Sequence, residues 1–351
     1  MNTIKNQILI VKESSPTIPV DTISIDLKVP EGNVVNACLA TESIRLDLTD
    51  IEKLLRAVKR LGVVTAMVKN EQVTSVIEGL YEKLYVSEQN NHKIGLAINP
   101  GGLDLRLFLY KWAYGFIYQS EHEHFIGFYD KYGQPTQTIH LKDKLQSQVL
   151  SDFIARFSHV DQTNMVSFEP IPINSETGLA EQVDLQQLEQ DWYTLQDVHH
   201  FTSLIEKHNI DRKKAYQLIS HQWAEQLTLC SIPSIFSSLQ TSKLQVMAFV
   251  GNEAAVQIAT GVINGHTLQG EHCFLTGKNF KLAINLSTID SLFVVKKPSD
   301  KGAIVVSSIE FFNKQNQTVL TLFGRRLESA SLDPDWIAFI DSIWPALQKS
   351  A

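Results

Sequence analysis

The sequence comprises 351 residues, of which 44% are hydrophobic, and it carries a formal net charge of −7 at pH 7. This length and apolar content predict a globular protein with about two domains rather than a disordered chain. The acidic balance disfavours nucleic acid and anionic membranes as partners, and no apolar stretch approaches the ~20 residues that span a bilayer, so we expect no stable membrane insertion.

The N-terminal segment lacks the apolar core of a signal peptide, so a cytoplasmic location is the simplest expectation. Its first 45 or so residues have no obvious counterpart later in the sequence and predict a short helical extension at best. Apolar residues at helical spacing then predict an amphipathic helix over Thr49–Arg60, capped by Thr49 or Asp50.

Two β segments and a linker follow in the first half. Every second residue of Leu103–Tyr110 is a leucine, which predicts a strand whose Arg106 points away from the leucine face. Gly115–Tyr129, followed by a turn at Asp130–Gly133, predicts a hairpin. Ser167–Gln182 contains two prolines, one glycine and few periodic apolar residues, so we interpret it as a linker.

The second half begins with two predicted helices. The first starts at about Asp184, and we interpret it as the counterpart of the Thr49–Arg60 helix because both precede a repeated strand. The second covers Leu195–His208. Its adjacent residues His199 and His200 diverge by about 100° on a helix, so only one of them can face a given centre.

The remaining elements of the second half are a helix, a strand and a hairpin. Asp211 is the expected N-cap of the next helix and places Arg212 in its first turn. Alternation over Phe280–Asn285 predicts a strand with a lysine on its less apolar face. Gly302–Phe312 and Thr318–Phe323 predict a hairpin around an asparagine-rich turn.

Two segments of the chain recur at one offset. Thr65–Glu71 returns as Met247–Glu253 after 182 residues (247 − 65), and Phe128–Lys131 returns as Phe311–Lys314 after 183 residues (311 − 128). A repeat of this length indicates a duplicated domain. We therefore expect halves at residues 1–166 and 183–351 joined by the linker at 167–182, each α+β with antiparallel strands, and a ligand site at their junction.

Common catalytic and metal-binding signatures are missing. The sequence has no Walker loop, G-x-G-x-x-G, G-x-S-x-G or H-E-x-x-H motif, which removes most nucleotide-binding and hydrolase functions. The three cysteines lack C-x-x-C spacing, so we expect buried, inert thiols. His122 and His124 alternate on a predicted strand but lack a third ligand nearby, which favours a solvated hairpin over a metal site.

Over nearly its full length the chain resembles bacterial haem-degrading and haem-trafficking proteins of the HemS/ChuS/HmuS type. The segments that carry the resemblance are Asn70-Glu71, Asp104–Leu109, Trp112, Asp197–Phe201, Phe249–Asn252, Lys296–Pro298, Ser307–Glu310 and Phe323–Arg326. The resemblance implies an α+β fold that is internally duplicated, with two central antiparallel β-sheets flanked by helices and one haem in the cleft between the halves.

The resemblance also implies site residues. The axial ligand of haem iron falls on His199 rather than His200, and its second ring nitrogen needs a hydrogen-bond partner that the sequence does not reveal. The distal and propionate-binding positions fall on Arg106, Arg212, Lys296 or Lys297, and Arg326. Arginine suits this role because its fork matches a carboxylate. The alternative for each basic residue is a solvated surface charge.

Two aromatic positions also bear on the expected haem site. Phe249 would contact the macrocycle, although it could equally be a core residue of its strand. Some family members carry Tyr where this chain has Phe323, so a hydrogen bond from that phenol is absent here.

The resemblance implies oxidative haem degradation in iron acquisition, with haem as both cofactor and substrate. His199 would hold the iron, Arg106 would assist on the dioxygen side, and the products would be a linear tetrapyrrole, carbon monoxide and iron. No flavin or nicotinamide signature is present, so an external reductant or reductase would supply electrons. The main alternative is a non-catalytic haem chaperone that takes haem from an importer to a separate oxygenase. A duplicated scaffold that binds no haem is the third hypothesis.

Overall fold

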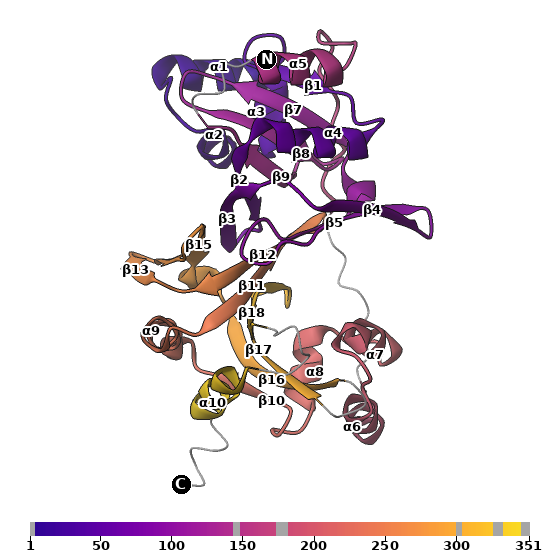
Figure 1. Ribbon diagram of the computed structural model, residues 1–351, viewed down its shortest axis with the longest axis vertical. Coiled ribbons are helices and arrows are strands. Elements are labelled where there is room, and N and C mark those ends of the chain that lie inside the picture. Colours follow the sequence, from indigo (N-terminus) through magenta and orange to yellow (C-terminus); the bar gives the residue numbers. More distant parts are fainter. Residues whose placement is uncertain (1–3, 143–147, 173–181, 300–303, 326–332, 345–351) are drawn as a thin grey trace. The chain divides into compact units, whose positions relative to one another are not determined.

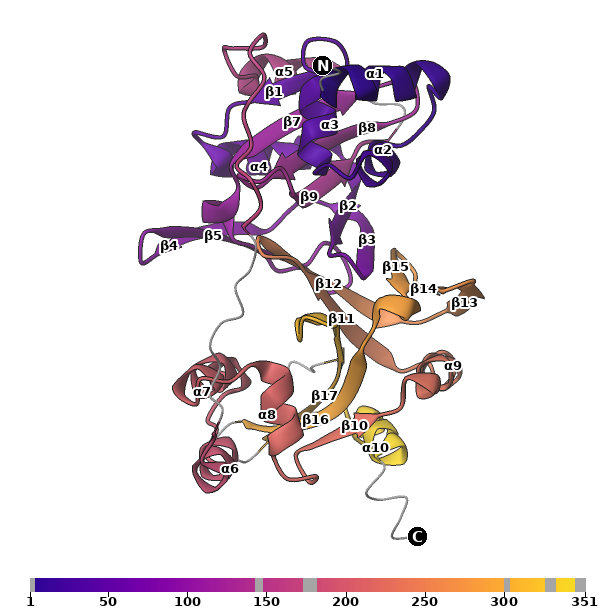
Figure 2. The ribbon, with the colours of Figure 1, turned by 180° about the vertical axis from the view of Figure 1, so that it is seen from behind.

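The computed structural model describes residues 4–142, 148–172, 182–299, 304–325 and 333–344 (Figures 1 and 2). The chain forms two compact units. The first unit comprises Met1–Lys69, Ser75–Pro172 and Gly251–Ile258, and the second comprises Asn70–Thr74, Ile173–Val250 and Ala259–Ala351.

The strands form two antiparallel sheets of nine strands each. In the first sheet the spatial order is β1 (Ser43–Leu46), β7 (Tyr114–Gln119), β8 (His124–Tyr129), β9 (Pro135–His140), β2 (Val63–Lys69), β3 (Val73–Leu80), β15 (Phe280–Asn285), β14 (His272–Thr276) and β13 (Gly265–Gln269). In the second sheet it is β10 (Ala224–Leu227), β16 (Ser291–Ser299), β17 (Ile304–Phe312), β18 (Thr318–Gly324), β11 (Gln245–Gly251), β12 (Ala255–Val262), β6 (Leu105–Leu107), β5 (His92–Ala97) and β4 (Leu84–Gln89).

Ten α-helices accompany the sheets within the described residues. They are α1 (Ile4–Ser14), α2 (Val20–Leu27), α3 (Glu31–Ala37), α4 (Ile51–Val58), α5 (Gln148–Phe157), α6 (Leu185–Tyr193), α7 (Phe201–Lys207), α8 (Arg212–Leu218), α9 (Ile232–Ser242) and α10 (Pro334–Ile343). None of these helices is long and apolar enough to cross a membrane. The expected α+β class and the duplication are confirmed.

The order of elements shows how the halves correspond. The series α1, α2, α3, β1, α4, β2 of the first half matches α6, α7, α8, β10, α9, β11 of the second. The counterpart of α4 is therefore α9, and the expectation that the helix after Asp184 fills this role is wrong. The first 45 residues also have a counterpart, and they form three helices and most of a strand rather than a short extension. The corresponding helices occupy the same place in the order of elements but are no longer similar in sequence, so the sequence repeat does not reveal their correspondence.

Most local expectations agree with the structure. Helix α4 starts after Asp50, whose carboxylate accepts the backbone N–H of Lys53. Strands β17 and β18 form the expected hairpin. Gly115–Tyr129, in contrast, is not one arm of a hairpin, because it contains both β7 and β8, which pair with each other. The turn expected after Tyr129 connects β8 to β9.

The strand expected over Leu103–Tyr110 is shorter than the leucine pattern indicates. Only Leu105–Leu107 pairs as β6, and Leu109–Lys111 turns into a 3-10 helix. The four leucines are all buried. Their alternation therefore reflects which side chains are buried, and the buried stretch is longer than the part that pairs as a strand. Within β6, Arg106 is half-exposed between two buried leucines, as expected.

Each unit contains a short segment from the other half of the sequence. Asn70 lies in the second unit, where its side-chain amide donates to the backbone oxygen of Val319 at 2.9 Å. Its repeat Asn252 lies in the first unit and donates to the backbone oxygen of Thr136 at 3.0 Å. In both loops the asparagine oxygen also accepts two backbone N–H groups. The repeated asparagine thus fixes its own loop and bonds it to the unit in which the loop lies.

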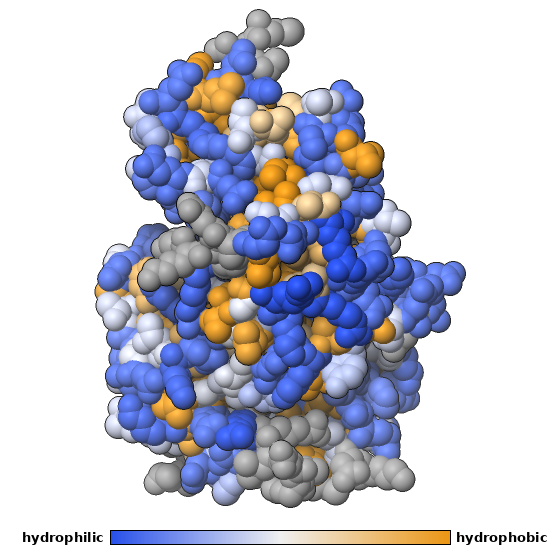
Figure 3. Space-filling model, turned by 45° about the horizontal axis from the view of Figure 1, so that its top comes forward, coloured by the Kyte–Doolittle hydropathy of each residue, from blue (hydrophilic) through white to orange (hydrophobic). Residues whose placement is uncertain are grey.

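In the second unit, helices cover the two faces of the sheet unequally. Helices α6, α7 and α8 pack over β10, β16 and the end of β17, around a buried aromatic cluster that includes Trp192, Phe201, Tyr216, Phe293 and Phe312. Helices α9 and α10 lie on the opposite face, where Phe236 stacks with Phe311 and the Trp336 indole donates to the Ser307 oxygen. The molecular surface seen in Figure 3 is mostly hydrophilic with scattered hydrophobic patches.

Candidate functional site

His199 lies in a 3-10 turn, Val198–His200, that leads into α7. The expected helix over Leu195–His208 therefore begins later than the sequence pattern predicts. Asp197 caps this turn, because its carboxylate accepts the backbone N–H of His199 at 2.8 Å. The side chain of His199 is 80% exposed, whereas Phe201 is buried. The turn thus presents an imidazole to solvent from a segment that is anchored in the core.

Asp197 also fixes the state of the His199 ring. Its Oδ1 lies 2.6 Å from His199 Nδ1, and a carboxylate can only accept, so Nδ1 carries the proton in a neutral ring. Nε2 then keeps its lone pair free for a ligand. The backbone and side-chain hydrogen bonds from His199 lower the pKa of Asp197, which keeps it ionised. Asp197 is the hydrogen-bond partner that the sequence could not identify.

A cluster of charged side chains lies behind this segment. Glu310 of β17 is fully buried and accepts from Lys297 Nζ at 2.6 Å and from Arg212 Nη1 at 3.3 Å. The Tyr216 hydroxyl of α8 accepts from the same two cations, at 2.7 Å and 3.3 Å. The ring of Phe201 lies 4.6 Å from Lys297 Nζ and 5.0 Å from the Arg212 guanidinium. The cluster therefore abuts the segment that carries His199.

The pKa values of the cluster favour one net positive charge at neutral pH. Burial alone would raise the pKa of Glu310, but Lys297 and Arg212 outweigh it and bring the value to about 2. Burial lowers the pKa of Lys297 to about 8 although Glu310 opposes this shift. Arg212 stays charged, and about one third of its side chain is exposed. Its guanidinium is therefore able to meet a ligand carboxylate.

Strand alternation separates the two candidate lysines. Lys297 shares a face of β16 with Phe293 and Val295, which pack under α6, α7 and α8. Lys296 points to the other face, where its ammonium donates to Asp341 at 2.9 Å and lies 4.4 Å from the Trp344 ring. The structure thus brings Lys297, and not Lys296, together with Arg212.

An open apolar strip continues the sheet face of this cluster. Phe249 and Phe323 meet edge to face with ring centroids 5.2 Å apart, and both are half-buried. Phe249 lies opposite Thr321, which lies opposite Glu310, so the strip and the charged cluster share one face. Phe249 is therefore a partly exposed side chain and not a fully buried core residue.

Arg106 and Arg326 are the two remaining candidates. Arg106 belongs to the first unit, where its Nη1 donates to Asp104 at 2.7 Å and two thirds of its side chain is covered. Burial raises the pKa of Asp104, and the Arg106 charge opposes the shift. Arg326 lies outside the described residues. Arg325 donates to the Gln245 side chain at 2.7 Å.

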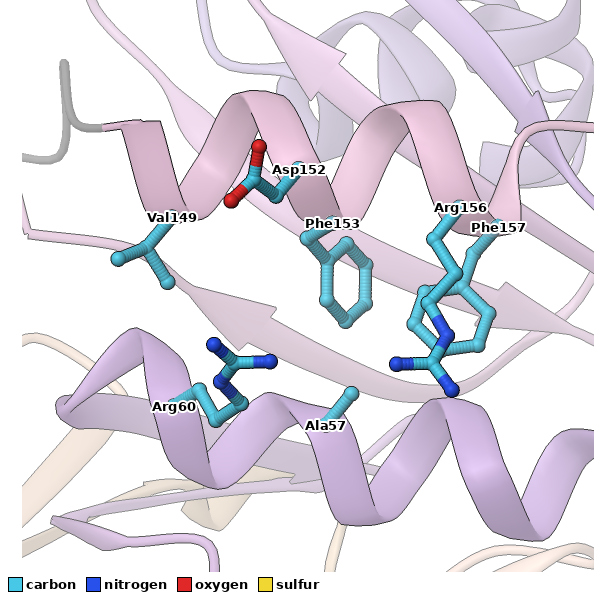
Figure 4. A pocket seen from close by; sticks show the side chains of 7 residues that line it. All are labelled: Ala57, Arg60, Val149, Asp152, Phe153, Arg156 and Phe157. Atoms are coloured by element: carbon cyan, nitrogen blue, oxygen red, sulfur yellow. The ribbon is translucent and has the colours of Figure 1, made fainter.

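A shallow hollow lies between α4 and α5 in the first unit (Figure 4). Its lining consists of Ala57, Arg60, Val149, Asp152, Phe153, Arg156 and Phe157. It contains no histidine and none of the predicted site residues. His122 lies in the turn before β8, as a solvated hairpin requires, and no group of metal-binding side chains is found among the described residues.

The sequence did not predict the residues that orient or support the ligand-binding side chains. Asp197 stands two positions before His199, and an acidic residue at that spacing before a turn was a usable signal. Glu310, Tyr216 and Phe201 left no such signal, because their roles depend on contacts between distant elements.

The comparisons with known proteins agree with each other. The family sequence model described as "Haemin-degrading HemS.ChuX domain" matches the chain twice, over residues 28–157 and 209–343. Hemin transport protein HemS of Yersinia enterocolitica is 26% identical over 340 residues, which cover 95% of each chain.

Two solved structures are similar over nearly the whole length. Holo-PhuS, described as a heme-binding protein from Pseudomonas aeruginosa, is 26% identical with a TM-score of 0.88, covering 97% of this chain and 98% of that one. ChuS, described as an E. coli heme oxygenase, is 26% identical with a TM-score of 0.83, covering 98% and 100%.

Proposed function

The chain belongs to the family of the haemin-degrading HemS.ChuX domain, and we propose that it binds haem and degrades it oxidatively in iron acquisition. The observation that carries the proposal is the His199–Asp197 pair. It presents an exposed imidazole whose Nδ1 faces a carboxylate and whose Nε2 points away from that bond, directly before a segment that packs on a positively charged cluster. A neutral imidazole oriented by a carboxylate is a suitable axial donor to haem iron.

The residues of the second unit fit the other parts of haem. Its two propionates stay ionised at neutral pH and need charge-assisted donors, which Arg212 supplies from a partly exposed side chain and Lys297 supports from the buried side of the cluster. We assign the lysine position to Lys297 rather than Lys296, because Lys296 is engaged by Asp341 on the other face. The half-buried rings of Phe249 and Phe323 offer apolar contact to a macrocycle.

Arg106 and Arg326 complete the proposed set. We assign Arg106 to the distal side, where a guanidinium with donors beyond its bond to Asp104 would hydrogen-bond a polar group or a water. Arg326 remains a proposed propionate donor. Bound haem would supply the redox chemistry, with dioxygen and an external reductant as co-substrates, and the chain's residues would bind, orient and shield it.

The axial ligand is tested by titrating the protein with haemin and following the Soret band. Wild type and His200→Ala should give the same defined maximum, whereas His199→Ala should lose it. His200 is the matched control because it is the adjacent, exposed histidine of the same turn. Loss of the maximum in His200→Ala alone would transfer the ligand to that residue.

A haem carrier is the second candidate, since one relative is described as a transport protein and a similar structure as a heme oxygenase. The deciding experiment supplies a reductant under air to the haemin complex, with catalase present. Decay of the Soret band with release of carbon monoxide and a linear tetrapyrrole supports degradation. A stable Soret band supports a carrier that passes haem from an importer to a separate oxygenase. We place either activity in the cytoplasm.

A further inference from the structure

Glu310 is a buried carboxylate for which the proposed haem chemistry has no direct use. It has no exposed surface, and it lies behind Arg212 and Lys297, so it cannot touch a ligand on the open face. Isolated ionised carboxylates are costly to bury unless they are paired and hydrogen-bonded. This one is fully engaged, because Lys297 and the Ser308 hydroxyl donate to Oε1 and Arg212 donates to Oε2.

The bonds of Glu310 fix two cations that would otherwise repel each other. Lys297 and Arg212 reach the two different oxygens of the same carboxylate, and both also donate to the Tyr216 hydroxyl. The two cations lie against one ring, Phe201. Removing the carboxylate leaves like charges together in a low-dielectric site, which disfavours the geometry seen here.

We propose that Glu310 is a positioning residue that holds Arg212 and Lys297 as a preformed cradle for a ligand carboxylate. The role of Glu310 rests on the proposed function, and it identifies the residue that organises recognition of the haem propionates. Arg212 and Lys297 carry two positive charges and Glu310 carries one negative charge, so the cradle has a net charge of +1, which balances one propionate. Through Phe201 the same contacts brace the segment that presents His199. Preorganisation of this kind raises affinity because the ligand does not have to order the donors.

The net charge of the cradle depends on whether Lys297 is protonated. Three residues with ionisable or charged side chains face Lys297. They are Glu310 from β17 and Arg212 and Tyr216 from α8, while the segment before α7 contributes the uncharged Phe201 ring. Above pH 8 Lys297 loses its proton, and the cradle loses its excess charge. Without Glu310 the ammonium loses its counter-charge, so Lys297 would titrate at lower pH by roughly 1–3 units.

The first test needs no haem. NMR of protein labelled with ¹³C-lysine, with Lys297 assigned by Lys297→Arg, follows the titration of this side chain. Wild type should titrate near pH 8, and Glu310→Gln should shift the midpoint down by roughly 1–3 units. The matched control is Glu31→Gln, which removes another buried carboxylate paired with a lysine, Lys69, at 2.7 Å in the first unit. This control should leave the Lys297 titration unchanged.

The second test compares the affinities for haemin and for haemin dimethyl ester, which has the same macrocycle without ionised propionates. The ratio of the two affinities isolates propionate recognition from iron ligation. In wild type it should favour haemin at pH 7 and decline between pH 7 and pH 9.5. Glu310→Gln should lower the ratio at pH 7 by about tenfold, the scale on which outer partners of a binding group act, and abolish its decline.

The outcomes separate this proposal from the proposed function. A wild-type protein that fails to bind haemin overturns the proposed function, and the lysine titration then decides on its own whether Glu310 organises the cluster. The proposal is overturned if Glu310→Gln leaves the Lys297 midpoint unchanged, if the affinity ratio stays equal or rises, or if Glu31→Gln has the same effects. Should Glu310→Gln not fold, Glu310→Asp replaces it. That variant keeps the charge with a shorter reach, so it should lower the ratio at pH 7 while Lys297 still titrates within roughly one unit of wild type.

Discussion

Replacing Asp197 separates two roles that this residue combines, orientation of the His199 ring and capping of the turn. Asp197→Ala removes both, whereas Asp197→Asn keeps a side-chain oxygen as cap and loses only the charge. The hydrogen bond to His199 Nδ1 is short, at 2.6 Å, and charge-assisted. Outer partners of a metal-bound histidine are worth about 10- to 100-fold in metal affinity. Because Asp197 is 48% exposed and His199 80%, solvent weakens the pair and we expect the lower end, about tenfold.

The assay is competition for haemin between each variant and apomyoglobin, read from the Soret bands. Asp197→Ala should lose about tenfold in affinity, equivalent to about 1.4 kcal/mol, and Asp197→Asn less. Asp191→Asn is a control, since the bonds of this aspartate go to Lys207 and His208 and not to His199. Wild-type affinity and an unchanged Soret maximum in Asp197→Ala would refute the argument that a carboxylate must orient the ligand.

Four further outcomes follow from the geometry. Glu310 has a folded pKa of about 2, below the ordinary 4.5, so its stabilising contribution is present above pH 4.5 and lost as the pH falls toward 2; urea unfolding of wild type should show an acid loss that Glu310→Gln lacks. Asn252→Ala should lower the free energy of unfolding by about 1–3 kcal/mol, because it removes bonds to five backbone groups, whereas Glu253→Ala on the same exposed loop should not. Arg106→Ala should keep haemin binding but slow the reductant-dependent decay of the Soret band; an unchanged rate would remove Arg106 from the distal assignment. Haemin titration should break at one equivalent, and a second break that survives His199→Ala would contradict this stoichiometry.

Local chemistry explains which elements the sequence predicted well. The sequence predicts Asp211 as a helix cap and narrows the cap of α4 to Thr49 or Asp50, because a cap is defined by residues within one turn of it. The hairpin of β17 and β18 was equally readable, since its turn residues lie between two strongly apolar runs. The family resemblance then supplied what patterns could not, namely the fold and the choice of His199.

Features that depend on pairing between distant segments were not predictable in the same way. Period-two alternation shows that Lys296 and Lys297 point to opposite faces, but the packing of α8 and α10 decides which face each lysine meets. The leucine pattern of Leu103–Tyr110 overstates its strand for a similar reason. Burial of leucines continues into a turn, while the ladder stops at Leu107, opposite Ala255, the first residue of the partner strand β12.

The duplicated elements show why the cluster of Arg212, Lys297 and Glu310 arises in the second half and has no copy at the corresponding positions of the first. Helix α8 begins with Arg212, whereas its counterpart α3 begins with the buried Glu31, so the charge at the start of the helix is inverted. The sheet differs in the same sense, because the residue opposite Thr321 is Glu310 and the residue opposite the corresponding Thr138 is Gly127. A carboxylate on the sheet holds two cations in the second unit. In the first unit a carboxylate on the helix meets Lys69 and Tyr129, and no excess positive charge results. Within the described residues, these corresponding positions therefore carry an excess positive charge in the second unit and none in the first, and this charge complements the ionised propionates of the proposed ligand.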